Sequence, residues 1–262
     1  MNWESAIIAA SATRPTPLLA ETFQHRYDTA SEPIRVTASD DRTWVVKGAA
    51  GERQIVNEQI VGRLGLALGA PVPQIGYVHV SEEFLSAEAS LLKPPSGLQP
   101  FMPGDWHGSV WVDGVIEARR MLWEHAIDPA NANRFARLAF LYGWCCCEQD
   151  HQFLYLKTPP HLVFSHDHGH FFCNAPDWNV QCLEEAPIAI LDNKIVSNCD
   201  LGRPELTEAL DAFRALDVDE VIAGAVAAPL ENWGVSLEER VAMAEYLFER
   251  HARLCSLDLG NS

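Results

Sequence analysis

Two aspartates, Asp150 and Asp167, lie at the ends of a segment that is expected to form a β-hairpin. Its apolar runs at residues 153–156 and 162–165 are separated by a Pro-rich turn, which predicts two paired strands. In phosphoryl transfer, one aspartate can orient the acceptor hydroxyl while another holds the metal that bridges the ATP phosphates. The layout therefore suggests Mg-ATP chemistry at the mouth of one cleft. The alternative is that both are ordinary turn or cap residues, since Asp favours the ends of elements.

A lysine and a glutamate occur earlier in the chain, on elements that can bring them together. Residues 34–37 and 43–47 read as two strands joined by a turn, and Lys47 ends the second strand. Apolar residues then recur at every fourth position of residues 54–68, which predicts a helix that carries Glu58 and ends at Gly69. Residues 75–80 are expected to return to the same sheet as a further strand.

The second half of the sequence reads as mostly helical. Prolines and glycines cluster between residues 93 and 104, which favours a domain boundary there. Apolar spacing over residues 135–146 predicts a helix that delivers the chain to Asp150. Three more helices are expected at residues 204–216, 218–228 and 236–257, the last beginning with a capping box formed by Ser236 and Glu239.

Composition excludes several kinds of partner. The net charge of -17 over 262 residues argues against binding to nucleic acid or to an anionic membrane surface. No apolar run approaches about 18 residues, so no membrane-spanning helix is expected. The 7 cysteines are odd in number and lack zinc-ribbon spacing. Together with an N-terminus that does not resemble a secretory signal, they predict reduced thiols and a cytoplasmic protein.

The order of these features is similar to that of a known family. A strand lysine, a helix glutamate, a Pro/Gly hinge, Asp150 and the Asp167 turn follow one another as in protein-kinase-like folds. The matching stretches are residues 12–18 (ATRPTPL), 46–48 (VKG), 57–64 (NEQIVGRL), 69–73 (GAPVP), 101–104 (FMPG) and 167–169 (DHG). More closely, these stretches resemble the HipA-like kinases.

The resemblance implies an α+β, two-lobed protein-kinase-like fold that binds ATP between its lobes. Residues 1–96 would form a small β-rich N-lobe, residues 97–104 the hinge, and residues 105–262 a mostly helical C-lobe. The implied activity is transfer of the γ-phosphoryl group of Mg-ATP to a hydroxyl acceptor, for which a protein serine or threonine is the family default. ATP and Mg²⁺ are the implied ligands.

The same resemblance assigns roles to individual residues. Lys47 would grip the ATP phosphates and Glu58 would pair with it. Asp167 would hold the metal, and Asp150 would act as the catalytic aspartate. A surface lysine on a strand and a solvated glutamate on a helix are the alternatives from sequence alone.

Three further residues complete the set that the resemblance implies. Phe101 and Met102, in the hinge, would contact the nucleotide. Gln152 would stand in as a second metal ligand, because the asparagine usual about five residues after the catalytic aspartate is replaced by Tyr155.

Two departures from the family keep a second function open. Besides Tyr155, the chain has no Gly-rich phosphate loop before Lys47, although the turn at residues 48–51 could present backbone N–H groups. A nucleotide-binding pseudokinase without catalytic activity is therefore an alternative.

A metal-dependent enzyme is a third possibility. His166, His168 and His170 would share one face of an extended segment, and imidazole suits zinc, iron and copper. Asp167 lies among these histidines, and His151 and His161 are nearby. These residues predict a hydrolase or oxygenase site if the three rings converge.

Overall fold

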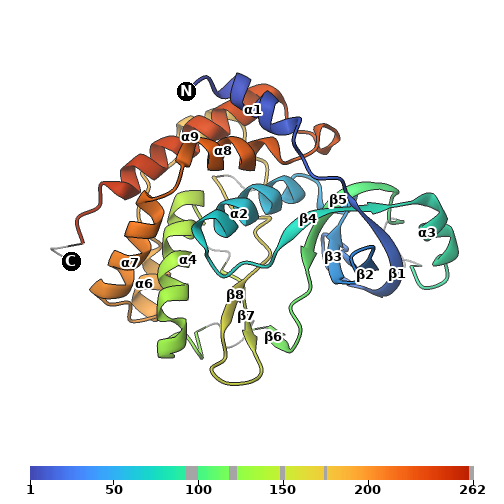
Figure 1. The fold of residues 1–262 in the computed structure, drawn as a ribbon, viewed down its shortest axis with the longest axis horizontal. Helices are drawn as coiled ribbons and strands as arrows, with labels where there is room; N and C mark the ends of the chain where they lie inside the picture. The colour runs from blue at the N-terminus through green and yellow to red at the C-terminus, as the bar shows by residue number, and fades with distance from the viewer. Residues whose placement is uncertain (93–99, 118–122, 148–150, 174–175, 260–262) are drawn as a thin grey trace.

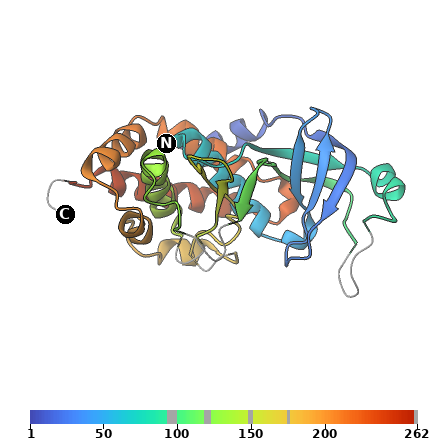
Figure 2. The same ribbon diagram turned by 90° about the horizontal axis from the view of Figure 1, so that it is seen from below.

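The computed structural model describes residues 1–92, 100–117, 123–147, 151–173 and 176–259. In this part of the chain a five-stranded barrel lies at one end, a group of helices at the other, and a small three-stranded sheet beside them (Figure 1). Seen from below, the barrel and the helices lie side by side along the longest axis (Figure 2). The chain is therefore a mixed α+β protein.

The barrel is closed by a parallel pair of strands. Its order is β1-β2-β3-β5-β4, and β1 pairs with β4 in parallel while the other neighbours are antiparallel. The strands are β1 (Leu18–Arg26), β2 (Ile34–Ala38), β3 (Thr43–Lys47), β4 (Ile75–Val80) and β5 (Gly104–Val110). Because alternate side chains of a strand point to opposite faces, Val36, Trp44, Val46 and Val78 fill the interior.

Of the barrel strands, the sequence predicted β2, β3 and β4 but missed β1 and β5. Most of β1 is exposed or half-exposed, with the polar residues Glu21, Gln24 and Arg26 among them, so it lacks the strict alternation by which half-buried strands are recognised. Its pairing with β4 also turns the expected β-rich lobe into a closed barrel rather than an open sheet. Closure removes the exposed strand edges that an open sheet would present.

Helix α2 (Gln54–Leu68) agrees with the prediction and ends at Gly69, which adopts a left-handed conformation at φ 67°. The predicted capping box of α9 is also present, with Ser236 and Glu239 bonded to each other's backbone. The helices other than α2 are α1 (Trp3–Ser11), α3 (Glu82–Ala87), α4 (Ala132–Cys145), α5 (Val180–Glu184), α6 (Asn193–Asn198), α7 (Arg203–Arg214), α8 (Val218–Ala227) and α9 (Leu237–Cys255). Short 3-10 turns lie at Ala49–Gly51, Pro129–Asn131 and Glu231–Trp233.

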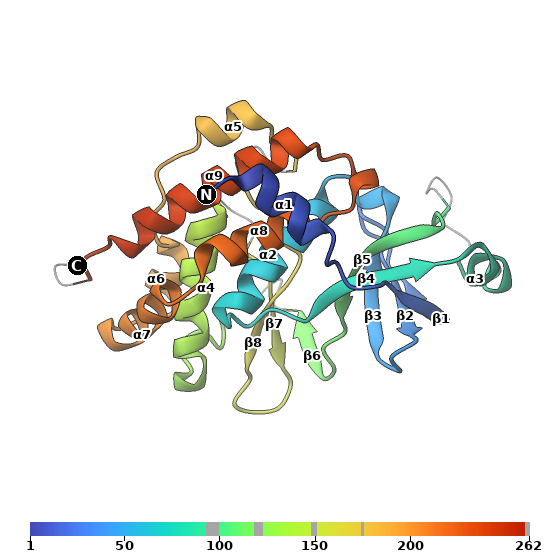
Figure 3. The ribbon, with the colours of Figure 1, turned by 45° about the horizontal axis from the view of Figure 1, so that its top comes forward.

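Elements on both sides of residues 97–104 pack across that segment. Helix α1 packs against α8 and α9 rather than against the barrel, as Figure 3 shows, because Trp3 and Ile7 bury with the helical core. On the other side, β5 pairs with β3 and β4. The barrel therefore continues to Val110, and residues 93–99, which include part of the expected hinge, lie outside the described residues.

The predicted hairpin is present and belongs to a separate small sheet. Strands β7 (Phe153–Leu156) and β8 (Val163–Ser165) pair with each other, and β6 (Val115–Glu117) pairs with β7. The backbone N–H of Ser165 donates to the carbonyl of Pro71 at 2.8 Å. This bond fixes the hairpin to the segment between α2 and β4, and so fixes the turn at Asp167 relative to the barrel.

Candidate active site

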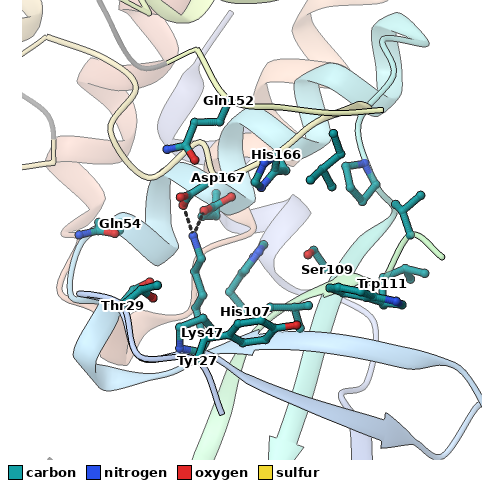
Figure 4. Close-up of a pocket in the computed structure, with 18 of the residues that line it drawn as sticks. Tyr27, Thr29, Lys47, Gln54, His107, Ser109, Trp111, Gln152, His166 and Asp167 are labelled. Carbon is teal, nitrogen blue, oxygen red and sulfur yellow. Dashed lines mark hydrogen bonds and ion pairs between the residues drawn. The ribbon is translucent and has the colours of Figure 1, made fainter. Parts of the chain in front are cut away.

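A cleft of about 1010 Å³ lies between the barrel and the hairpin (Figure 4). The barrel contributes β3, β5 and the loop between β1 and β2, and the opposite wall comes from β7 and the turn after β8. One end is polar, with Lys47 as its cation, and the other is lined by apolar side chains. The apolar lining residues are Ala30, Pro33, Val45, Pro73, Val110, Trp111, Val112, Val115, Phe153 and Leu154.

Lys47 enters the cleft because of its position on β3. Trp44 and Val46 point into the barrel, so the alternation of the strand turns Val45 and Lys47 toward the cleft. The Lys47 ammonium forms ion pairs with both Glu58 and Asp167, and Figure 4 shows the Asp167 carboxylate beside it. Burial alone would lower the pKa of Lys47, but the two carboxylates outweigh burial and raise it, so the side chain is charged.

Glu58 is brought to this cation by α2, which begins seven positions after Lys47. Its side chain is 6% exposed. Burial acts to raise the pKa of Glu58, but the ammonium of Lys47 outweighs that effect and lowers it. The carboxylate is therefore ionised and holds the lysine in the cleft.

Asp167 reaches Lys47 from the far side of the cleft, 120 residues along the chain. It adopts a left-handed backbone at φ 58°, a conformation that Asp tolerates better than most residues. Burial acts to raise the pKa of its carboxyl, and Lys47 more than offsets this and holds the pKa far below the usual range. Its side chain remains 35% exposed, so the carboxylate faces both the lysine and the open cleft.

Asn57 fixes the turn after Asp167 to α2. Its side-chain amide donates to the carbonyls of Gly169 at 2.8 Å and Phe171 at 3.1 Å, and its carbonyl oxygen accepts from the indole of Trp178 at 2.8 Å. Asn57 is 0% exposed. Because Asn57 and Glu58 are adjacent, one turn of α2 holds both the lysine and the aspartate turn.

Of the other expected site residues, only some line the cleft. Gln152 lines the cleft beside Asp167 (Figure 4). Phe101 and Met102 are not among the lining residues: the Phe101 ring lies over Gly48, and Met102 is half-exposed. Asp150, the expected catalytic residue, lies outside the described residues.

Residues of β5 and of the β1–β2 loop line the cleft without having been expected there. His107, Ser109 and Trp111 follow one another at alternate positions, and Thr29 and Ser31 come from the loop. The alternation of residues 107 to 111 could have predicted a strand with one face toward the cleft. The loop could not be predicted, because β1, which precedes it, was missed. The turn at residues 48–51 is not among the lining residues, whereas the loop at Thr29 and Ser31 is.

The histidines do not converge as a metal centre requires. His168 Nε2 is 2.8 Å from the Ser165 hydroxyl, His151 Nε2 is 3.0 Å from Asp192, and His170 is exposed. Over the described part of the chain, no group of three or more His, Cys, Asp or Glu residues could hold a metal ion. The prediction of a three-histidine site is therefore not supported: His166 and His170 line the cleft, whereas His168 is buried beside Ser165.

Tyr155 belongs to the small sheet and is not a lining residue of the cleft. It is 1% exposed, and its ring packs edge-on against His125 with centroids 5.2 Å apart. The position expected for an asparagine ligand is thus a core position, and Gln152 is the amide on the cleft side of this strand.

The comparisons with known proteins agree on a kinase-like fold. A solved structure entitled "Crystal structure of the golgi casein kinase" is 12% identical, with a TM-score of 0.51 over 99% of this chain and 76% of that chain. A second, "crystal structure of the Golgi casein kinase with Mn/ADP bound", is 12% identical, with a TM-score of 0.49 over 100% of this chain and 78% of that one. No curated protein matches the chain.

The family comparison covers α2 and four of the five barrel strands, because it includes most of β1 together with β2, β3 and β4 but not β5. The family model described as HipA-like kinase matches residues 20–103, a span that contains Lys47 and Glu58. The resemblance to the HipA-like kinase family that the motifs indicated is therefore confirmed over residues 20–103.

Within the described ranges, no helix is long and apolar enough to cross a membrane.

Proposed function

We propose that this protein is an ATP-dependent phosphotransferase that moves the γ-phosphoryl group of Mg-ATP to a hydroxyl acceptor. The observation that carries the proposal is the convergence of Glu58 and Asp167 on Lys47 at the polar end of a large cleft. A cation held by one buried carboxylate and facing one open carboxylate suits a metal-bound phosphate chain.

The shape and polarity of the cleft support a nucleotide as its ligand. Ligand pockets commonly measure about 300–1,000 Å³, and the cleft of about 1010 Å³ lies at the top of that range. Its apolar end around Val45 and Trp111 suits a flat base, and its polar end at Lys47 suits the phosphates. Opposite ends of opposite character would orient the nucleotide along the cleft.

The residues present also fit Mg²⁺. Mg²⁺ prefers oxygen ligands and is commonly bound by one or two carboxylates together with substrate phosphates. Asp167 offers a carboxylate and Gln152 an amide oxygen on the same wall. When bound, the ion would neutralise phosphate charge. Lys47 would then hold the phosphate oxygens, and Glu58 would keep the Lys47 ammonium in place.

The acceptor side of the reaction is assigned to Asp150. We propose that Asp150 orients the acceptor hydroxyl, and that the acceptor is a serine or threonine of a protein, as the family resemblance implies. The assignment is checked by Asp150→Asn, for which phosphoryl transfer should fall by about 10²-fold or more while Mg-ATP still binds, the usual scale for general acid–base groups. Transfer at the parent rate would remove Asp150 from the mechanism.

A non-catalytic nucleotide-binding protein is the second candidate. The observation in its favour is the buried position of Tyr155, which leaves the strand after Asp150 without the usual asparagine ligand. Gln152 would then have to complete the metal site. Nucleotide binding without transfer to any member of a broad panel of protein and small-molecule acceptors supports this candidate.

The deciding experiment is a thermal shift assay followed by transfer of labelled γ-phosphate. ATP with Mg²⁺ should raise the melting temperature, because a ligand that binds only the folded state stabilises it. ATP with EDTA should raise it much less, and Zn²⁺ alone should not raise it. A shift with Zn²⁺ alone and none with Mg-ATP would instead support a metal-dependent enzyme.

We also propose a cytoplasmic location. In the described part of the chain the 7 cysteines are thiols rather than disulfides, and most are buried, as is usual for proteins of a reducing compartment. Titration of the denatured, unreduced protein purified from its own cells should find close to all of these thiols. Recovery of four thiols or fewer would point to stable disulfides and an oxidising compartment.

A further inference from the structure

One wall of the cleft carries two polar side chains at alternate positions of β5. His107 lies opposite Lys47 in the register with β3, and Ser109 lies opposite Val45. Gly108 between them faces the barrel, where an added Cβ would meet Val78 at 2.8 Å and Trp44 at 3.1 Å. Figure 4 shows His107 beside Lys47, with Ser109 between His107 and Trp111.

The backbone donors next to Ser109 are already used inside the barrel. The N–H of Val110 donates to Gln74 at 2.8 Å, and the N–H of Trp111 donates to Thr43 at 2.9 Å. Neither can bond to a ligand without breaking the barrel. The Ser109 hydroxyl lies in the cleft and makes no hydrogen bond with the described residues. On this stretch of wall, side chains therefore supply the polar contacts.

His107 is the buried partner in this wall. It is 2% exposed, and its Nδ1 has no hydrogen-bond partner among the described residues. No other lining residue of the cleft has a buried side-chain nitrogen or oxygen in that condition within the described part of the chain. Burial lowers the pKa of His107 to about 4, so the ring is neutral near pH 7. Because His107 lines the cleft, this buried nitrogen without a partner is a candidate contact for a ligand group or for a water that bridges to one.

We propose that Ser109 and His107 form a subsite for the 6-substituent of a purine base, and that this subsite accepts a 6-oxo group as well as a 6-amino group. The inference rests on the proposed nucleotide binding. A hydroxyl can donate or accept, and a neutral imidazole can present either tautomer. An apolar wall would instead leave a 6-oxo group without a donor.

The position of the base follows from the two ends of the cleft. Phosphates directed toward Lys47 place the base near Val45 and Trp111, and Ser109 is paired with Val45. Ser109 would contact the 6-substituent first. His107 lies two residues further along β5, about 7 Å by strand geometry, and would reach the same group directly or through one water.

The test compares three triphosphates that differ at this position: adenosine (6-amino), inosine (6-oxo) and purine riboside (no substituent), each titrated with Mg²⁺ by calorimetry. For the parent protein, the Kd values of the first two should agree within about tenfold. Both should be about fivefold or more tighter than purine riboside triphosphate, the worth of one net hydrogen bond. In Ser109→Ala this advantage should disappear, while the Kd of the unsubstituted nucleotide stays within about twofold.

Two further variants sharpen the result. Ser86→Ala, at an exposed position of α3 away from the cleft, should leave all three Kd values unchanged. His107→Gln keeps hydrogen-bonding groups at the wall and should retain part of the advantage.

The subsite is overturned if inosine triphosphate binds more than about a hundredfold weaker than ATP, or if the advantage survives in Ser109→Ala. In either case, if ATP still binds, the proposed function is not contradicted. Absence of binding by all three nucleotides overturns the proposed function, and the subsite with it.

Discussion

Asn57 and Glu58 are neighbours on α2, yet they belong to two polar clusters of different character. Glu58 joins Lys47 and Asp167 in a charged cluster that opens onto the cleft through Asp167. Asn57 joins Trp178 and two backbone carbonyls in a neutral cluster closed to solvent.

The difference shows which contacts can be exchanged for ligand contacts. A charge that faces a cleft can trade its protein partner for a phosphate or a metal ion, at little cost in unpaired groups. A buried amide with three hydrogen bonds has no such alternative, because each lost bond leaves a desolvated group. We therefore expect the charged cluster to govern binding and chemistry, and the neutral cluster to govern stability and the position of the Asp167 turn.

The largest effect is expected for Asp167→Asn, which removes the open carboxylate of the charged cluster. Phosphoryl transfer and Mg-dependent ATP affinity should fall together, with activity reduced by about 10²-fold or more. Calorimetry with and without Mg²⁺ and labelled γ-phosphate transfer measure the two losses. Asp200→Asn, at an exposed position, is the matched control. Full affinity in Asp167→Asn would break the comparison, because this carboxylate would then be structural.

Asn57→Leu tests the neutral cluster. It removes three hydrogen bonds and leaves two carbonyls and an indole N–H buried, so the free energy of unfolding should fall by about 3 kcal/mol. Asn133→Ala, an exposed site on α4, should change it by less than about 0.5 kcal/mol. Denaturant titration compares these variants.

Asn57→Leu also separates positioning from stability. If the cluster positions the Asp167 turn, the folded variant should lose kcat more than KM. Asn57→Gln, which keeps an amide donor and an amide acceptor, should recover part of the loss. Normal kcat in a destabilised protein would leave Asn57 with a structural role alone.

Lys47→Met tests the cation of the charged cluster through its effect on ligand affinity. The variant loses the cation at the polar end of the cleft, so Mg-ATP should bind about tenfold or more weakly. Lys157→Met, at an exposed position, controls for loss of a positive charge. A parent-like Kd, measured by calorimetry, would show that Lys47 serves only its two carboxylate partners.

The smallest effect concerns pH. Glu58 and Asp167 have folded-state pKa values below their ordinary values of 4.5 and 3.8. Their contribution to stability is therefore complete above those ordinary values and is lost as pH falls through the lower folded-state values. Lys47 has a raised pKa, so its contribution is complete below its ordinary value of 10.5 and is lost at higher pH.

The charged cluster should thus stabilise the fold most between about pH 5 and 10. The stability difference between the parent and Glu58→Gln should shrink from pH 7 to pH 3.5, whereas the difference caused by Asn57→Leu should stay constant. Denaturant titrations at the two pH values measure both. A constant difference for Glu58→Gln would contradict the ion-pair interpretation.

Local patterns were sufficient for most elements of the fold. The alternation of β2 and β3, the spacing of α2 and the capping box of α9 follow from rules that act over a few residues. Strand β1 was not predicted because its pairing partners, rather than its own sequence, determine that it is a strand. The closed barrel was missed for the same reason, since closure depends on β1 pairing with β4.

The chain order of Lys47, Glu58 and Asp167 was readable from the sequence, because each follows a recognisable strand, helix or hairpin. Their convergence, over a separation of 120 residues, was decided by tertiary packing. The cleft wall at His107 and Ser109, and the separation of the histidines, were decided in the same way. Sequence periodicity reports which face of an element is buried, but the partner of that face is chosen only when distant segments share one core.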